Sequence, residues 1–362
     1  MRICLIRVEL FAWGKYGGFG RTARMLGREL VKQGVEVFAV VPRRSGQGPE
    51  ETLDGMTVWS FAPHDLSGAK ALLRKCNADV YHSQEASLST YLAMIAAADK
   101  KHVVTFRDHK LFRDWLIELR YPSRNLLRTL LAAVYERNFL VARAIRRADA
   151  LFCAAEQQID RVSRIYGLDP KPEFLPSPIE IPDRGMKKSE QPTVLSVGRL
   201  DKRKRPWLFF DLVKEYPAVR FVAAGESQNK EWDSQLRQRY GKLPNLEIAG
   251  FINQFESDRL ANYMEKSWVL ANTAAREGLP TSFLEGLAYE CAVLSHVNPD
   301  RVASRFGYHV EEQDFAHGLD RLLENGTWRA KGKEGRFYVK QHYDRDQVIA
   351  RHINLYSNLI GA

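Results

Sequence analysis

The chain has 362 residues, of which 54 are Lys or Arg and 44 are Asp or Glu, giving a net charge of +10. Hydrophobic residues make up 45% and charged residues 27%, a composition that excludes disordered and fibrous proteins and predicts a globular one. The longest stretch without Asp, Glu, Lys or Arg covers residues 86–98, which is shorter than the roughly 20 residues that span a bilayer. At this length we expect two domains.

The N-terminal segment is interrupted by Arg2, Arg7 and Glu9, so it lacks the apolar core of a secretory signal and predicts a cytoplasmic protein. The cysteines form no Cys-x-x-Cys pair, and the histidines show no metal-ligand spacing. We therefore expect no disulfide framework, no structural metal and no cofactor. The four cysteines are Cys4, Cys76, Cys153 and Cys291.

In the first half of the chain, short apolar runs alternate with amphipathic segments, the pattern of parallel strands joined by helices. This predicts a Rossmann-like, doubly wound α/β domain over residues 1–175. Helices are expected at residues 21–33, which Gly34 follows, and at 126–147. Strands are expected at residues 3–8, 35–41, 58–61, 80–82, 102–106 and 150–153.

Three prolines, at positions 176, 178 and 182, disfavour both a helix interior and a central strand, and they predict an interdomain linker at residues 176–185. The same alternation then resumes, predicting a second Rossmann-like domain over residues 186–343 that faces the first across a cleft. The amphipathic tail, residues 344–362, is expected to be a helix that packs back on the first domain. Strands are expected at 193–197, 220–224, 246–249 and 268–271, and helices at 206–216 and 281–289.

A glycine-rich turn precedes the first predicted helix. Gly17, Gly18 and Gly20 leave the backbone without Cβ atoms where a helix N-terminus could accept a phosphate. The alternative is that these glycines serve only the geometry of a tight turn.

The first strand of the second domain leads into Gly198-Arg-Leu-Asp-Lys-Arg-Lys-Arg. Arg199 and Lys204 would lie at a strand end beside a helix start, where guanidinium and ammonium groups bind phosphate oxygens. This pattern predicts a diphosphate site. Lys202, Arg203 and Arg205 are expected to be solvated charges.

A third motif reads Arg276-Glu-Gly-Leu-Pro-Thr-Ser-Phe-Leu-Glu285, in which Gly278 marks a turn and Pro280 suits the first position of a helix. Glu277 in the turn and Glu285 in the helix would lie on either side of a ligand held by the helix amides, which suits a polyhydroxyl group joined to a phosphate. The alternative is that Glu277 only complements the helix dipole and that Glu285 is solvated.

Together, the glycine-rich turn, the Gly-Arg-Leu-x-x-x-Lys motif at 198–204 and the Glu-Gly-x₆-Glu motif at 277–285 resemble retaining glycosyltransferases of family 4, which have the GT-B fold. The resemblance spans nearly the whole chain. The segments Val-Ala-Ala-Gly225 and Ala-Gly-Phe251 also fall where that family has strand ends.

The resemblance implies a UDP- or GDP-sugar donor, a hydroxyl acceptor and no metal. It implies that Arg199 and Lys204 hold the diphosphate, Glu277 the donor sugar and Glu285 the ribose. It places Phe251 and Ile252 near the base. Further donor contacts are implied for Gly17, Gly18, Gly198, Gly225, Gly278, Leu279, Pro280 and Thr281.

One segment departs from the family pattern. Where that family commonly has Thr-x-His-Asp, this chain reads Thr105-Phe-Arg107-Asp108-His109. Either Arg107 serves the sugar in place of the histidine, which we favour, or His109 does so. The alternative is a structural Arg107–Asp108 pair with a solvated His109.

The acceptor is not identified by the sequence, and Gln84, Glu85, Asp108 and His109 are candidates to contact it. Two other functions compete with sugar transfer: a sugar-nucleotide epimerase of the same architecture, and a basic protein that binds polyanions. No recognition helix or RNA-binding motif is visible, so specific nucleic-acid binding is not expected.

Residues 107–147 contain ten basic residues against four acidic ones, interleaved with aromatic and aliphatic side chains. This composition suits a surface that contacts anionic lipid at the inner face of a membrane. If so, the acceptor is expected to be lipid-linked. The alternative is an ordinary helix with an apolar core face and solvated arginines.

Overall fold

The computed structural model describes residues 1–6, 9–14, 16–121 and 126–361. The chain divides into two compact units. The first comprises residues 1–109, 130–178 and 345–362, and the second comprises residues 110–129 and 179–344. The change from one unit to the other after Pro178 falls within the predicted linker. Residues 110–129, which the sequence analysis assigns to the first domain, group instead with the second unit.

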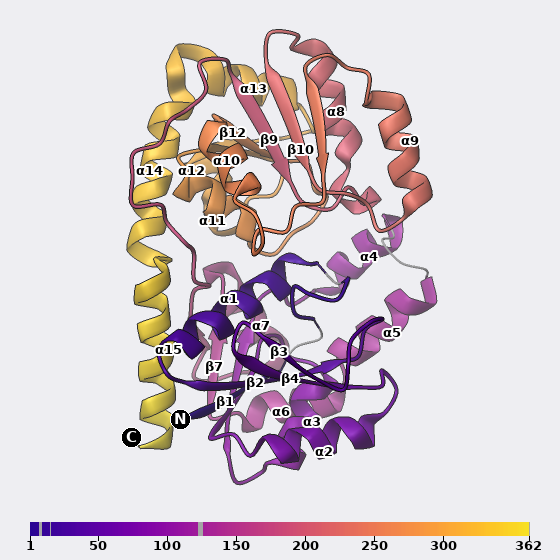
Figure 1. The fold of residues 1–362 in the computed structure, drawn as a ribbon, viewed down its shortest axis with the longest axis vertical. Coiled ribbons are helices and arrows are strands. Elements are labelled where there is room, and N and C mark those ends of the chain that lie inside the picture. The colour runs from indigo at the N-terminus through magenta and orange to yellow at the C-terminus, as the bar shows by residue number, and fades with distance from the viewer. Residues whose placement is uncertain (7–8, 15, 122–125, 362) are drawn as a thin grey trace. The chain divides into compact units, whose positions relative to one another are not determined.

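The first unit is built on a sheet in the order β3-β4-β2-β1-β5-β6-β7-β8, parallel except for the edge strand β3 (Figure 1). Successive residues of β1 face opposite sides: Ile3 and Leu5 join one buried cluster, and Cys4 and Ile6 join another. Both faces of the sheet are therefore covered, as in a doubly wound fold. The strands are β1 (Arg2–Ile6), β2 (Glu36–Pro42), β3 (Glu50–Leu53), β4 (Met56–Phe61), β5 (Val80–Ser83), β6 (Lys101–Phe106), β7 (Ala150–Cys153) and β8 (Glu173–Phe174).

The helices of this unit begin and end at residues with clear roles. Gly34, with φ of 78°, follows α1, and Gly167, with φ of 61°, follows α7, both in the left-handed region that glycine tolerates. The C-terminal helix α15 carries Ile349 and Tyr356 into the same buried cluster as Ile3. The helices are α1 (Gly18–Lys32), α2 (Leu66–Cys76), α3 (Leu88–Ala96), α6 (Phe139–Arg147), α7 (Glu156–Tyr166) and α15 (Arg345–Ile360), together with the part of α5 (Leu126–Glu136) that begins at Leu130.

The prediction of a single helix over residues 126–147 is wrong, because the structure has two helices there, α5 and α6. The break is at Asn138, whose side-chain Oδ1 accepts hydrogen bonds from the amides of Leu140 (2.9 Å) and Val141 (3.0 Å). An asparagine that caps the free amides of a new helix favours a restart at this position.

The second unit has an all-parallel sheet in the order β11-β10-β9-β12-β13-β14. Strands β13 and β14 are not predicted by the sequence analysis, because they are short and lie in a stretch rich in helical segments. The strands are β9 (Thr193–Val197), β10 (Arg220–Ala224), β11 (Leu246–Gly250), β12 (Val269–Asn272), β13 (Ala292–Ser295) and β14 (Gly307–His309).

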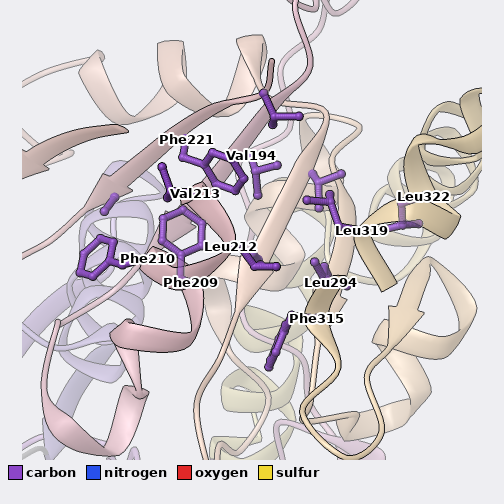
Figure 2. Packing of buried hydrophobic residues seen from close by; sticks show 14 of the residues in the cluster. Val194, Phe209, Phe210, Leu212, Val213, Phe221, Leu294, Phe315, Leu319 and Leu322 are labelled. Carbon is purple, nitrogen blue, oxygen red and sulfur yellow. The ribbon is translucent and has the colours of Figure 1, made fainter. Parts of the chain in front are cut away.

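Helix α8 supplies much of the core of this unit. Phe209 and Phe210 lie near Val194 of β9 and Phe221 of β10, and the rings of Phe209 and Phe221 are 5.5 Å apart (Figure 2). On the general scale for large buried side chains, each contributes about 2–3 kcal/mol of hydrophobic free energy to folding. The helices are α4 (Phe112–Arg120), α8 (Pro206–Glu215), α9 (Lys230–Tyr240), α10 (Arg259–Lys266), α11 (Thr281–Ala288), α12 (Val302–Arg305), α13 (Phe315–Leu323) and α14 (Thr327–His342).

Candidate functional site

The order of the strands locates a candidate site in the second unit. From β9 the chain adds β10 and β11 on one side and then β12 and β13 on the other, so the direction of winding reverses between β9 and β12. In open α/β sheets, ligands bind beyond the carboxyl ends of the strands at this switch point. The loops that follow β9 and β12 contain residues 198–205 and 273–280, which are the two charged motifs of the sequence.

Two predicted glycines shape the backbone at the end of β9. Gly198 and Gly225 have φ of 145° and 150°. A Cβ on Gly225 would overlap the carbonyl group of Gly198, and the Gly198 amide donates to the carbonyl of Ala224 at 3.0 Å. Glycine is therefore required at position 225, because the loops after β9 and β10 approach each other too closely for a side chain.

Lys204 and Glu277, which the sequence assigns to the donor, form an ion pair in the structure. Burial lowers the pKa of Lys204 below its usual value, while the charge of Glu277 opposes that shift. Burial alone would raise the pKa of Glu277, but the charges of Lys204 and Arg203 hold it below its usual value. The structure thus brings one residue from each motif into contact at the switch point.

Hydrogen bonds between the two loops fix this pair. The hydroxyl of Thr273 donates to the carbonyls of Lys204 (2.7 Å) and Arg205 (3.0 Å), and the amide of Ala275 donates to the carbonyl of Arg203 (3.0 Å). In return, the guanidinium of Arg205 donates to the carbonyl of Thr273 at 2.7 Å and to that of Ala274 at 3.2 Å. The loops after β9 and β12 therefore behave as one structural element.

The expectation that Arg203 and Arg205 are solvated is wrong. Arg205 is 4% exposed, and the side chain of Arg203 is 14% exposed and paired with Glu118. Only Lys202 of the three is exposed, with its ammonium group 5.2 Å from the ring centre of Trp232. A run of basic residues is predicted to be solvated when the residues that pair with it lie far away in the sequence.

Arg199, the second predicted phosphate ligand, follows β9 and keeps 28% of its side chain exposed. Its guanidinium lies 3.3 Å from the carboxylate of Asp201. Asp201 in turn accepts a hydrogen bond from the hydroxyl of Ser227 at 2.9 Å. Arg199 is thus oriented by an acidic neighbour yet remains more open than the arginines around it.

The predicted donor residues of the third motif lie in the turn between β12 and α11. Helix α11 begins at Thr281, so Pro280 is the residue before the helix, not its first residue as expected. Glu285 lies within α11 and is partly exposed, whereas Leu279 is buried. Phe251 and Ile252 lie elsewhere, directly after the edge strand β11, and Phe251 is 37% exposed.

In the first unit, the predicted acceptor residues follow β5 and β6, and three of them form one partly buried cluster. Glu85 accepts hydrogen bonds from the amides of Arg107 and Asp108, each at 2.9 Å. The ring of His109 lies 3.8 Å from Glu85 and 3.0 Å from the hydroxyl of Tyr166. His109 is 4% exposed, so the alternative that it is solvated is wrong.

This cluster keeps Glu85 ionised. Burial by itself would raise the pKa of Glu85, but His109 and the amides of Asp108 and Arg107 stabilise the carboxylate and lower its pKa to about 2. Tyr166 and its contact with His109 are not predicted by the sequence analysis, because Tyr166 lies on α7, far along the chain.

Arg107, at the end of β6, is 4% exposed. Its guanidinium donates to the hydroxyl of Ser177 at 2.5 Å and to the side-chain carbonyl of Gln84. The structure therefore places Arg107 in a buried polar network of the first unit, together with Gln84, which the sequence indicates as a candidate acceptor contact.

Gly17 and Gly18 stand at the start of α1. Gly18 is the first helical residue, and Gly17 precedes the helix in an extended conformation. A Cβ on Gly17 would overlap the carboxylate of Glu9, a residue that the sequence analysis does not assign to the site. An acidic side chain of the chain itself therefore lies beside this helix N-terminus.

Within the described residues, no group of three or more His, Cys, Asp or Glu side chains is arranged to hold a metal ion. Across the same part of the chain, no helix has the length and apolar character needed to cross a membrane.

Two α/β units, each built on a largely parallel sheet, are the architecture of the GT-B fold. Residues 16–181 match the model of Glycosyltransferase Family 4, and residues 179–336 match that of Glycosyl transferases group 1. The chain belongs to glycosyltransferase family 4 and has the GT-B fold, as its sequence motifs suggested. Family membership favours sugar transfer over the epimerase and polyanion-binding alternatives.

Individual proteins resemble the chain more distantly. It is 26% identical over 204 residues to WbnH of Escherichia coli, an O-antigen biosynthesis glycosyltransferase, and the match spans 54% of this chain and 57% of WbnH. Sucrose-phosphate synthase from Thermosynechococcus elongatus has a TM-score of 0.73 at 16% identity, with 99% of both chains covered. HepE from Anabaena, solved with UDP-glucose, has a TM-score of 0.73 at 13% identity, with 99% of this chain and 100% of HepE covered.

Proposed function

We propose that this protein transfers a sugar, with retention of anomeric configuration, from a UDP- or GDP-sugar to a hydroxyl acceptor in the synthesis of a glycan, glycolipid or cell-envelope polysaccharide. The observation that carries the proposal is the Lys204–Glu277 pair, with Arg199 nearby in sequence, at the switch point of the second unit. WbnH, which acts in O-antigen biosynthesis, and HepE, which binds UDP-glucose, support the choice of donor and pathway class.

In this proposal, Arg199 and Lys204 hold the diphosphate, and the amides of Gly278, Leu279 and Thr281 add hydrogen bonds at the start of α11. Glu277 contacts hydroxyls of the donor sugar, and Glu285 contacts the ribose. Phe251 and Ile252 lie against the base. The cationic side chains stabilise the negative charge of the leaving diphosphate, so the proposed reaction requires no metal.

The retaining route follows from this division of roles. The acceptor hydroxyl attacks on the face from which the diphosphate leaves, and a departing phosphate oxygen takes the hydroxyl proton. No enzymic nucleophile is required, and the enzyme contributes positioning and charge stabilisation. We propose Arg107 as a further sugar contact, with Glu85, Asp108 and His109 on the acceptor side.

The test of nucleotide binding is protection against heat. UDP or GDP at about 100 times its Kd should stabilise the protein by about 2.7 kcal/mol and raise its Tm by a few degrees. An RNA oligonucleotide at the same charge concentration serves as the control for nonspecific anion binding. Protection by RNA but by neither nucleotide would contradict the proposal and favour a polyanion-binding protein.

The exposed surface of α5 and α6 suggests where the acceptor is located. Helices α5 and α6 of the first unit carry four exposed apolar side chains, among exposed arginines. An apolar surface with basic residues suits insertion into the headgroup region of an anionic membrane. We therefore propose peripheral membrane contact at the cytoplasmic face and a lipid-linked acceptor. The apolar residues are Leu130 (51% exposed), Leu131 (59%), Val134 (64%) and Phe139 (78%), and the arginines are Arg137, Arg143, Arg146 and Arg147.

Sedimentation with lipid vesicles tests the membrane proposal. The protein should sediment with anionic vesicles at low salt and be partly released at high salt, because salt screens its attraction to the headgroups. Phe139→Ser should weaken binding, whereas Phe337→Ser, at a residue 64% exposed on α14, serves as the matched control. No binding to anionic vesicles at low salt would contradict the proposal and favour a soluble acceptor.

A further inference from the structure

Helix α4 lies in the sequence between two strands of the first sheet, β6 and β7, yet it groups with the second unit. Its acidic residues are Asp114 and Glu118. Because they are four residues apart, their side chains lie on the same face of the helix. None of the three sequence motifs includes them.

Both carboxylates contact arginines of the loops after β9 and β12, residues 198–205 and 273–280, which we call the donor loops. Glu118 accepts a hydrogen bond from Arg203 at 2.6 Å and lies 3.9 Å from the guanidinium of Arg276. Asp114 forms an ion pair with Nε of Arg276 at 3.0 Å. The other oxygen of Asp114 accepts a hydrogen bond from the amide of Leu111 at 2.7 Å, which fixes the carboxylate at the start of the helix.

The four charges are largely withdrawn from solvent. The side chain of Arg276 is 4% exposed, and those of Arg203, Asp114 and Glu118 are 14%, 14% and 11% exposed. Arg199, by comparison, keeps 28% of its side chain exposed. Buried charges interact strongly because little water screens them, so Asp114 and Glu118, together with the nearby charge of Glu277, neutralise the two arginines.

These arginines adjoin the residues proposed to do the chemistry. Arg203 precedes Lys204 in the chain, and Arg276 precedes Glu277. The backbone carbonyl of Arg203 also accepts the hydrogen bond from Ala275 that joins the two loops. A side chain that fixes both arginines therefore also fixes the backbone next to Lys204 in one loop and next to Glu277 in the other.

We propose that Asp114 and Glu118 are positioning residues of the donor site, which neutralise Arg203 and Arg276 and keep their guanidinium groups from the diphosphate. This inference rests on the proposed function. Arg199 and Lys204 then bind the diphosphate, and α4 stabilises the conformation of the donor loops.

The proposal predicts opposite effects on binding and turnover. Without the Glu118 carboxylate, Arg203 loses its ion-pair partner and adds positive potential close to the donor loops, so a nucleoside diphosphate should bind more tightly. Turnover should fall, because the donor loops lose an anchor and the diphosphate product is released more slowly. A residue that served the fold alone would lower both affinity and Tm.

The experiment is calorimetric titration of UDP and GDP into the full-length protein at low and high salt. Glu118→Gln should bind the preferred nucleotide about fivefold to tenfold more tightly at low salt, with a steeper salt dependence. Adding Arg203→Gln to that variant should return the affinity to the wild-type value. Glu215→Gln removes an exposed carboxylate of α8 and is the matched control.

Unchanged or weaker nucleotide binding by Glu118→Gln, or no restoration by Arg203→Gln, would overturn the proposal. Binding of neither UDP nor GDP by the wild-type protein would instead place the failure in the proposed function. Donor cleavage measured on the same variants supplies the second readout, since a lower kcat with tighter product binding is the signature expected of Glu118→Gln.

Discussion

Lys204→Ala is expected to slow sugar transfer by roughly a hundredfold or more, a loss on the order of 3 kcal/mol of transition-state stabilisation. The reason is that the Lys204 ammonium is proposed to stabilise the charge that develops on the leaving diphosphate. The measurement is kcat for transfer from the preferred nucleotide sugar. A kcat within a few fold of the wild-type value would contradict the role of Lys204.

The same substitution removes the partner of Glu277, and this separate effect must be controlled. Loss of one member of a fully buried ion pair typically costs about 3–5 kcal/mol of stability, because the other charge remains unpaired. The Lys204–Glu277 pair is partly buried, with 23% and 13% of the two side chains exposed, so its loss should cost less than that. The double variant Lys204→Met/Glu277→Gln removes both charges at similar volume, so its Tm should recover towards that of the wild type. Its kcat should stay low, because both residues are proposed to contact the donor. A low kcat at a restored Tm would show that the loss of activity at this pair does not come from a loss of stability.

Acid pH is expected to destabilise the first unit through two buried histidines. His82 on β5 contacts the hydroxyls of Tyr356 and Thr105, each at 2.7 Å, and its ring lies 6.0 Å from that of His352 on α15. Burial lowers the pKa of both histidines, and that of His352 falls from 6.5 to about 4. The charge of Arg107 lowers both further.

The direction of the effect follows from these pKa values. Because the folded protein keeps His352 neutral down to a pH of about 4, the unfolded chain binds more protons between pH 6.5 and 4. Stability is therefore fully present above pH 6.5 and falls with decreasing pH, by about 1.4 kcal/mol per pH unit for each such histidine. For His352 the total loss by pH 4 is about 3 kcal/mol.

Chemical denaturation between pH 7 and 4.5 measures this loss. His352→Leu should flatten the pH dependence of the unfolding free energy, even if it changes stability at pH 7. The carboxylate of Glu85, with a pKa of about 2, stays ionised in the folded protein across this range. It contributes little above pH 5, because the unfolded carboxyl group binds protons only near its usual pKa of 4.5. An identical pH dependence in the variant and the wild type would show that folding does not lower the pKa of His352.

The repeating strand and helix pattern predicted most of the fold, because each buried parallel strand is a short apolar run that local sequence reveals. The second and third motifs each indicate a ligand-binding loop, and these two loops meet because the carboxyl ends of neighbouring parallel strands share one edge of the sheet. Lys204 and Glu277, 73 residues apart, form a pair as a consequence of that rule.

Contacts that depend on packing between distant segments could not be predicted in this way. Glu118 and Arg203 are 85 residues apart, and nothing in the local pattern of either indicates the other. For the same reason, the sequence pattern places α4 in the first domain and predicts a solvated Arg203, and the structure differs in both. The burial of His109 against Tyr166, 57 residues away, is a further example.

The central claim is transfer with retention from a nucleotide sugar without a metal. Its most direct test is NMR of the product formed from α-linked UDP- and GDP-sugars and a panel of octyl glycosides, in a buffer containing EDTA. We expect a new α-glycosidic bond, identified by the coupling constant of its anomeric proton. A β-linked product, or transfer that occurs only when a divalent metal is added, would contradict it.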